Sequence, residues 1–210
     1  MDAVEVALAA IAHVDGPGRP SVPGSRTPSS ALPRSYSFAV TDTTPPVDEE
    51  DLVAVAAERE TLEEFLEYHR RALSGKLRGL SEEDARRRLV PSMTTMIGLV
   101  SHAAAVERNW FQHYLGGKPR EEITGNARGD APSWDVGAGK TIGGVIAEFE
   151  SACAASRQIA ADFALDQTVP HDELGQVSLR WIYVHIIREH ARHIGHADIL
   201  REQVDGATGD

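Results

Sequence analysis

The chain has 210 residues, of which 41% are hydrophobic and 25% charged, and a formal net charge of −11. This composition predicts a soluble globular protein with a sizeable core, and no apolar run reaches the roughly 18 residues that a membrane span requires. A single cysteine, Cys153, excludes an internal disulfide and a multi-cysteine zinc site, which favours a cytoplasmic location. An acidic chain without basic clusters also argues against nucleic acid as a partner.

The first 47 residues differ in composition from the rest. Residues 16–36 are rich in Pro, Gly and Ser, which is typical of a disordered tail. Residues 1–14 are partly apolar but carry Asp2 and Glu5 and have no basic start, so we do not interpret them as a signal peptide. A short tethered helix or an upstream start codon explains them equally well. We predict a tail over residues 1–47 and one domain over residues 48–208.

From residue 47 onward, apolar side chains recur at three- and four-residue spacing, which predicts helices almost throughout. Glycine and proline separate a connector helix from four long helical segments, and a short extended piece is expected within residues 169–177. Four helices with one long connection predict an all-α fold, a four-helix bundle. The connection, residues 118–140 with Arg128 and Trp134, is either a lid or a plain surface crossover. The long segments are expected at residues 48–76, 95–115, 142–164 and 178–204, and the connector at 81–89.

His102 lies on the apolar side of the second long segment, at helical spacing from its apolar neighbours. A lone histidine on such a face is more often a satisfied core residue than a ligand, so a second observation is needed. The neighbours are Leu99, Ala103, Val106 and Trp110.

The last segment supplies that observation, because Glu189 and His193 follow its apolar stripe. A buried carboxylate must be protonated, paired or bound to a cation. Spacing of i and i+4 places both side chains on one helix face, as in zinc sites of the His-x-x-x-His type. With His102 from another helix, three ligands could converge and leave the open position typical of a catalytic divalent metal.

The structural alternative is that Glu189 forms an ion pair with Arg192 or His185. Helical geometry places His185, Glu189 and His196 in one row, so either histidine could hold a metal-bound carboxylate in place. His190 points about a quarter-turn away from this row.

Residues 95–111 (TMIGLVSHAAAVERNWF) and residues 178–206, which begin SLRWIYVHIIREHARHIGH, resemble the actinobacterial branch of the DinB-like superfamily. The similarity covers most of residues 50–208. It implies an up-down-down-up four-helix bundle with a divalent metal. It also implies a family relationship to thiol-dependent S-transferases and to the mycothiol-dependent maleylpyruvate isomerases.

Carried over to this chain, the resemblance assigns His102, Glu189 and His193 as ligands, similar to the His/Glu/His set of those isomerases. Two positions depart from the branch. A tyrosine usually stands where this chain has His190, and an asparagine where it has Ile194, which could change the polarity or shape of the pocket.

A metal with an open position lowers the pKa of a bound thiol or water. We therefore expect a metal-dependent S-transferase in which mycothiol, or a similar thiol, attacks a small electrophile. Cys153 is expected to fill the core and not to act as the nucleophile. Arg180, Arg192 and Trp110 are candidates for substrate binding, against the alternatives of surface ion pairs for the arginines and core packing for Trp110, as for Trp181.

A second hypothesis is a metal-binding bundle without turnover, acting in stress response or sensing, with a homodimer as one form. A third is metal-assisted hydrolysis with Glu189 as general base, which its i+4 partner argues against. Imidazole and carboxylate suit zinc, nickel, iron and manganese alike, with zinc as the first expectation and nickel as the second.

Overall fold

The computed structural model describes residues 53–209, and all of them belong to one compact unit, Pro45–Asp210. The predicted tail over residues 1–47, and residues 48–52 of the predicted first helix, lie outside the described residues.

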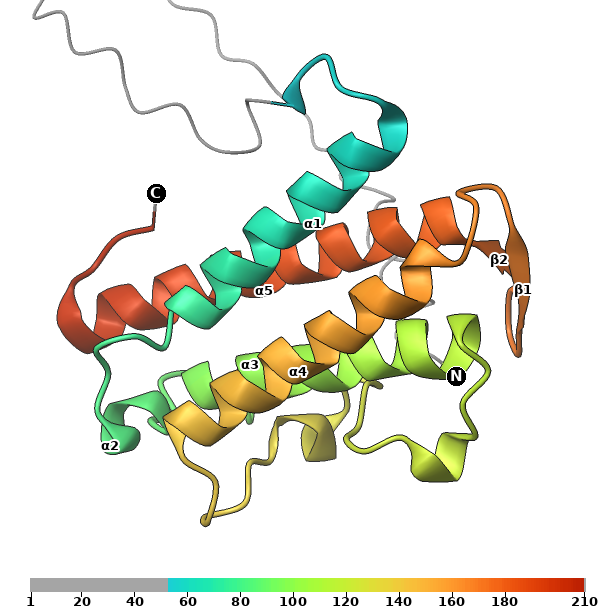
Figure 1. Ribbon diagram of the computed structural model, residues 1–210. Helices are drawn as coiled ribbons and strands as arrows, with labels where there is room; N and C mark the ends of the chain where they lie inside the picture. The colour runs from blue at the N-terminus through green and yellow to red at the C-terminus, as the bar shows by residue number, and fades with distance from the viewer. Residues whose placement is uncertain (1–52, 210) are drawn as a thin grey trace, which may run out of the picture. The chain divides into compact units, whose positions relative to one another are not determined.

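The described part is mainly helical and contains one short hairpin (Figure 1). Its four long helices correspond to the four predicted segments, and the hairpin β1–β2 falls where a short extended piece was expected. In chain order the elements are α1 (Glu58–Gly75), α2 (Glu82–Ala85), α3 (Met96–Glu107), the π-helix η2 (Arg108–Leu115), the short 3₁₀ helices η3 (Arg120–Glu122) and η4 (Ala131–Trp134), α4 (Ile142–Ala161), β1 (Thr168–His171), β2 (Gly175–Ser178) and α5 (Leu179–Asp205).

Hydroxyl side chains begin four of the five α-helices. In each case the side-chain oxygen accepts a hydrogen bond from the backbone N–H three residues on, at 3.0–3.2 Å, which satisfies an otherwise unpaired donor of the first turn. α5 ends at Asp205 and is capped by Gly206, whose φ of 76° is a left-handed conformation that glycine adopts without steric cost. These capping residues are Ser81, Thr95, Thr141 and Ser178.

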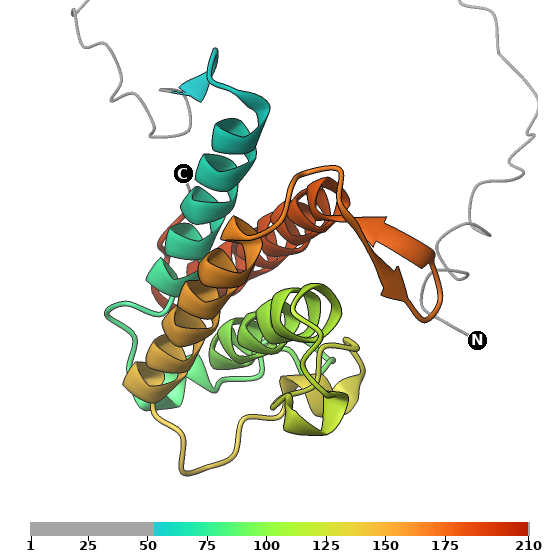
Figure 2. The ribbon, with the colours of Figure 1, turned by 45° about the vertical axis from the view of Figure 1, so that its right-hand side comes forward.

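The four long helices form a bundle of the predicted up-down-down-up type. α1 and α5 run in one direction and α3 and α4 in the other (Figure 1). α1 packs mainly on α5, α3 packs on both α4 and α5, and α1 touches α4 much less. The connection between the parallel helices α3 and α4 is therefore a crossover. Figure 2 shows the hairpin standing out from one end of the bundle.

The core lies between the four helices and consists of two clusters of buried apolar side chains, one on each half of the bundle. Phe149 and Val145 lie in the first cluster, and Phe111 and Ile186 in the second, each at most 1% exposed. Cys153 is buried on α4, as expected. Within residues 53–209, every helix is too short or too polar to cross a membrane.

Three details of the packing differ from the sequence prediction. Among the described residues, α1 begins at Glu58, later than predicted, and Val55 before it is 99% exposed. Phe65, one of the apolar side chains whose helical spacing predicts a buried face for residues 48–76, is 37% exposed, whereas Arg70 is buried because it ion-pairs inside the bundle. Trp181, expected in the core, is 39% exposed because it lies on the first turn of α5 at the hairpin end.

Candidate functional site

His102 lies in the middle of α3 and is 3% exposed. Its Nδ1 is 3.3 Å from the backbone carbonyl oxygen of Asn126, in the connection between α3 and α4. When the proton is on Nδ1, this nitrogen donates to the carbonyl, and the lone pair of Nε2 is available to a ligand. Burial lowers the pKa of His102, so the neutral imidazole is the favoured form.

His193 lies opposite His102 on α5, with 5.2 Å between the centroids of the two perpendicular rings. It is 5% exposed, and neither Nδ1 nor Nε2 has a hydrogen-bond partner. Burial, aided by the neighbouring His102, lowers the pKa of His193 to about 3. Its imidazole is therefore a neutral group with unsatisfied nitrogens in the interior of the protein, a state that costs free energy.

Glu189 lies one turn before His193 on the same face of α5. Its Oε2 is 3.8 Å from Nε2 of His193, and its side chain is 17% exposed. The other oxygen, Oε1, lies 3.3 Å from Arg188 and 3.4 Å from Arg192. The structural alternative of an ion pair with Arg192 is thus present in the structure, and it leaves Oε2 facing the histidine.

Trp134, in η4, covers the two histidines. Its ring centroid is 4.5 Å from that of His102 and 5.7 Å from that of His193. The connection between α3 and α4 is a folded segment that lies directly on α3. Asp130 fixes it by accepting hydrogen bonds from Asn126 and Ser133, both at 2.7 Å.

Two glycines allow this close approach. A Cβ on Gly98 of α3 would lie 3.0 Å from the carbonyl oxygen of Trp134, and a Cβ on Gly125 would lie 2.7 Å from Cβ of Ala105. Gly125 also has a φ of +91°, a conformation that other residues rarely adopt. The segment over residues 118–140 therefore forms a fitted wall above His102.

The chemistry of these three side chains fits a divalent metal. His102 and His193 offer neutral imidazole nitrogens and Glu189 offers a carboxylate oxygen, which together suit zinc, nickel, iron or manganese. The two unpartnered nitrogens of His193 are the strongest sign of fit, because ligation would satisfy one of them. As the side chains stand, no group of three His, Cys, Asp or Glu within residues 53–209 is arranged to hold a metal ion, so ligation would require these side chains to move.

The other predicted site residues lie at varied distances from this group. His196 is exposed, with its ring centroid 5.9 Å from that of His193. His185 lies between Trp110 and Trp181, with centroids 4.6 and 4.8 Å away, and its Nδ1 contacts Arg188 at 3.0 Å.

Among the candidates for substrate binding, Arg180 forms an exposed ion pair with Glu58 at 2.5 Å, whereas Arg192 lies beside Glu189. Trp110 is 8% exposed and packs in an aromatic cluster at the hairpin end, where His171 of β1 stacks on it at 5.1 Å.

The sequence analysis missed a buried ionic network beside this site. Glu107, the last residue of α3, is completely buried and accepts hydrogen bonds from Arg70 at 2.8 and 2.6 Å. Nε2 of His190, also completely buried, is 3.0 Å from Oε1 of Glu107. Burial acts to raise the pKa of Glu107, but the charge of Arg70 and the hydrogen bonds from His190 and Arg70 outweigh it and keep the carboxyl ionised.

The network gives His190 a role that the sequence did not indicate, because its side chain, turned away from Glu189, points into the core. It continues the buried row of Ile182 and Ile186 at i+4 spacing, whereas Glu189 lies at the edge of that row and keeps part of its side chain in solvent. The available signal was Glu107 itself, a carboxylate at the end of a helix in which almost every residue is buried.

Comparison with known proteins identifies the family of this chain. A model of the family described as mycothiol S-transferase matches residues 61–206, well over half of the chain and the whole of the bundle from the first turn of α1 onward. No curated protein gives a significant match. The family model and the helical bundle agree with the resemblance drawn from the sequence, and this chain belongs to the mycothiol S-transferase family.

Proposed function

We propose that this protein is a divalent-metal-dependent S-transferase that joins the sulfur of mycothiol to a small electrophile, with His102, Glu189 and His193 as the metal ligands. The family supports the thiol. The observation that supports metal binding most strongly is that both ring nitrogens of His193 are buried and unpartnered, beside His102 and Glu189. Zinc is the first candidate and nickel the second.

The bound metal would lower the pKa of a coordinated thiol, so that a thiolate forms at neutral pH. Three features of the chain's own residues favour the binding of a metal and a thiol here. The low pKa values of His102 and His193 keep both imidazoles free of protons that would compete with ligation. The carbonyl of Asn126 fixes the orientation of the His102 ring, and Trp134 excludes water from the side of the crossover.

Cys153 supports the use of an external thiol. It lies on α4, is 3% exposed, and lines a cavity together with Arg70 and Arg157. None of the three candidate metal ligands lines this cavity. Burial, with the nearby carboxylate of Glu107, raises the pKa of its thiol well above the usual range. A thiol that resists ionisation is a poor nucleophile.

The deciding experiment is elemental analysis of the full chain after dialysis against a mild chelator and reloading with zinc or nickel. We expect about one equivalent of metal in the wild type and a loss of most of it in His193→Ala and His102→Ala. His69→Ala on α1, which changes a histidine outside the site, is the matched control and should keep the metal.

The activity itself is tested with mycothiol and 1-chloro-2,4-dinitrobenzene, a general electrophile for S-transfer. Consumption that requires both mycothiol and His102 would support the transferase. Metal that binds at the three residues without any turnover over a panel of electrophiles would instead identify a metal-binding module. A well-folded wild type that takes up no metal would overturn the site.

A further inference from the structure

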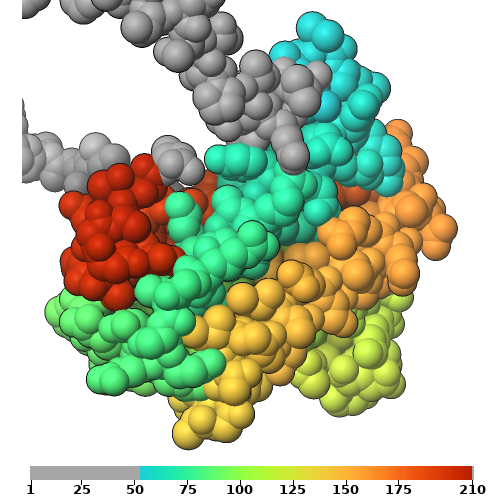
Figure 3. Space-filling view, turned by 60° about the vertical axis from the view of Figure 1, so that its left-hand side comes forward, coloured from blue at the N-terminus to red at the C-terminus, as the bar shows by residue number. Residues whose placement is uncertain are grey.

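A cleft lies between α1 and α4, which are side by side in Figure 3. It consists of two cavities of about 300 and 340 Å³ that share Glu67, Arg70 and Arg157. None of the three candidate metal ligands lines either cavity. The cleft exists because α1 packs mainly on α5 and α4 mainly on α3, which leaves the space between α1 and α4 incompletely filled.

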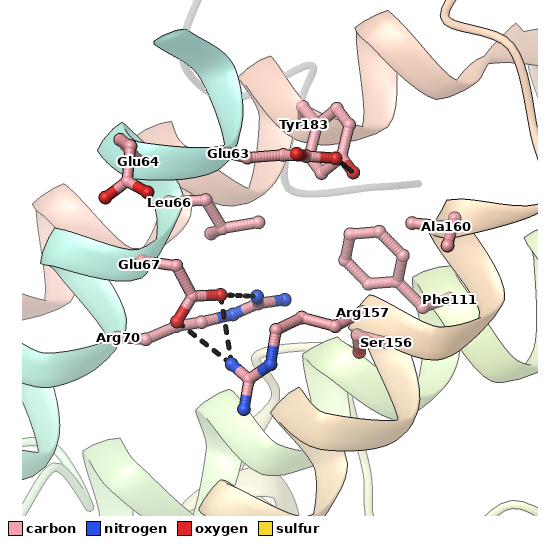
Figure 4. A pocket seen from close by; sticks show the side chains of 11 residues that line it. Glu63, Glu64, Leu66, Glu67, Arg70, Phe111, Ser156, Arg157, Ala160 and Tyr183 are labelled. Atoms are coloured by element: carbon pink, nitrogen blue, oxygen red, sulfur yellow. Dashed lines mark hydrogen bonds and ion pairs between the residues drawn. The ribbon is translucent and has the colours of Figure 1, made fainter. Parts of the chain in front are cut away.

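The first cavity has an apolar wall. Phe111 and Leu66 form its floor and Tyr183 and Ala160 continue it (Figure 4); each is at most 3% exposed, so a ligand reaches them only when the side chains above them move. The hydroxyl of Tyr183, another lining residue, donates to Glu63 at 2.9 Å. A wall of this kind favours a ligand with a flat or branched hydrocarbon body.

The junction of the two cavities is cationic and already holds a carboxylate. Glu67 accepts hydrogen bonds from Arg70 at 2.6 Å and from Arg157 at 3.0 and 2.9 Å, as the dashed lines in Figure 4 show. Arg70 is itself fixed from below by Glu107 and lies over the ring of Phe111, 5.7 Å from its centroid. Arg70 is therefore held in place for a carboxylate, whereas Arg157, whose side chain is 50% exposed, contacts both oxygens of Glu67 through Nη1 alone.

The second cavity extends the cationic character. Arg71 and Arg78 join Arg70 and Arg157 in its lining, against the carboxylates of Glu67 and Glu150. Four arginines around one opening stand out in a chain whose formal net charge is −11. Over the whole cleft these four arginines face four carboxylates, Glu63, Glu64, Glu67 and Glu150, so an anion gains a cationic partner only where it displaces one of them.

We propose that the cleft between α1 and α4 is a binding site for a small apolar carboxylic acid. The hydrocarbon body lies on Phe111, Leu66 and Tyr183, and the carboxylate takes the place of Glu67 between Arg70 and Arg157. Glu67 then acts as an internal competitor that swings into solvent when the ligand enters. The site depends on neither the metal nor the thiol.

The test uses 2-naphthoate as the probe and isothermal titration calorimetry of the full chain. The neutral isostere 2-naphthamide has the same body without the charge. We expect the acid to bind about tenfold more tightly than the amide, or better, because a charge-assisted pair of hydrogen bonds is lost in the amide. Equal affinities, or no binding of the acid at millimolar concentration, would overturn the proposal.

Two variants should move the affinity for 2-naphthoate in opposite directions. Arg157→Ala removes half of the guanidinium pair and should weaken binding about tenfold. Glu67→Gln removes the competing charge and should strengthen the binding of 2-naphthoate severalfold.

Glu64→Gln, also on the lining of the cleft, is the matched control. It removes the same charge from the rim without releasing a guanidinium, so its effect should be small. Equal gains in Glu67→Gln and Glu64→Gln would show that only the general charge matters and would contradict the role of Glu67. Circular dichroism checks that each variant is folded, and Arg157→Lys, which keeps the charge, replaces Arg157→Ala if that variant does not fold.

Discussion

His193 shows how a single residue can cost stability where it is proposed to serve function. Both of its ring nitrogens are buried without a partner, and an unsatisfied buried polar group costs about 1–3 kcal/mol. An apolar side chain of similar size does not carry this cost. In the absence of a metal, the imidazole is therefore an unfavourable choice for this position.

We expect His193→Leu to raise the free energy of unfolding of the chelator-treated protein by about 1 kcal/mol or more. The same variant should lose the increase in melting temperature that zinc or nickel gives the wild type. Urea titration and thermal unfolding measure the two effects, with His196→Leu on the exposed side of α5 as control. A His193→Leu protein that is less stable than the chelator-treated wild type would show that the imidazole has a structural partner.

His185 gives a pH dependence with a defined sign. Burial lowers the pKa of this imidazole from about 6.5 to about 4. Between these values the unfolded chain binds a proton that the folded chain excludes. The contribution of His185 to stability is therefore complete above about pH 6.5 and is lost as the pH falls toward 4.

We expect the free energy of unfolding to fall between pH 7 and pH 5, and to fall less in His185→Gln than in the wild type. Urea titrations across this range measure the difference between the two proteins, which cancels the contributions of carboxylates common to both. Parallel pH profiles for the two proteins would refute the assignment.

At the scale of elements, the ion pair of Arg70 with Glu107 and the contact of His190 with Glu107 join three helices inside the core. Arg70 comes from α1, Glu107 from α3 and His190 from α5. The network fixes the rotation of α3 and α5 about their axes, and hence the directions in which His102 and His193 point.

We expect Glu107→Ala to destabilise the protein by about 3–5 kcal/mol, because it leaves the charge of Arg70 buried without its main partner. The double variant Arg70→Met with Glu107→Leu should recover much of this loss, since no charge is then left unpaired. Urea titrations of the single and double variants measure both values. A Glu107→Ala protein as stable as the wild type would mean that water or Glu67 compensates Arg70 fully.

The crossover between α3 and α4 is held against α3 by the absence of a side chain at Gly125. We expect Gly125→Ala to destabilise the protein by about 1–3 kcal/mol, because a Cβ at a φ of +91° is strained and would overlap Ala105. It should also weaken metal binding, since Asn126 and Trp134 would shift away from His102. Gly129→Ala, also at positive φ but in open space, separates strain alone from the loss of contact. Equal metal affinities in the two variants would contradict the role of the crossover.

The sequence predicted where the helices lie better than it predicted which of their side chains point into the core. The starts of two helices were predictable because capping is local: Ser81 and Ser178, with which two of the predicted segments begin, cap those helices. The inward direction of His190 was not predictable, because it depends on a partner, Glu107, that is 83 residues away.

The end of α3 is a second case. From Arg108 to Leu115 the helix widens into a π-helix, with the N–H of Gly116 bonded to the carbonyl of Phe111 at 2.8 Å. A period of 3.6 residues then no longer describes which side chains share a face, so Trp110 cannot be placed from its spacing to His102.

At the scale of the whole molecule, the two proposed sites open between different helices, although α5 contributes residues to both. The candidate metal ligands lie on α3 and α5 under η4, whereas the cleft lies between α1 and α4. Arg70 lines the cleft and His190 neighbours Glu189, so the network through Glu107 crosses the core from one site to the other. The two proposed ligands would thus be connected through the buried ion pair of Arg70 with Glu107.

The bundle should fold without the first 47 residues. Within the described part, the side chains of both core clusters lie between Leu62 and Leu200, and the family match spans residues 61–206. We propose residues 48–208 as the domain and expect a fragment of residues 48–210 to keep the melting temperature of the full chain within about 2 °C, which corresponds to less than about 1 kcal/mol for a domain of this size. Its metal content and its affinity for 2-naphthoate should also be unchanged. A fragment that melts much earlier, or that binds either ligand more weakly, would place part of the fold or of a site in residues 1–47.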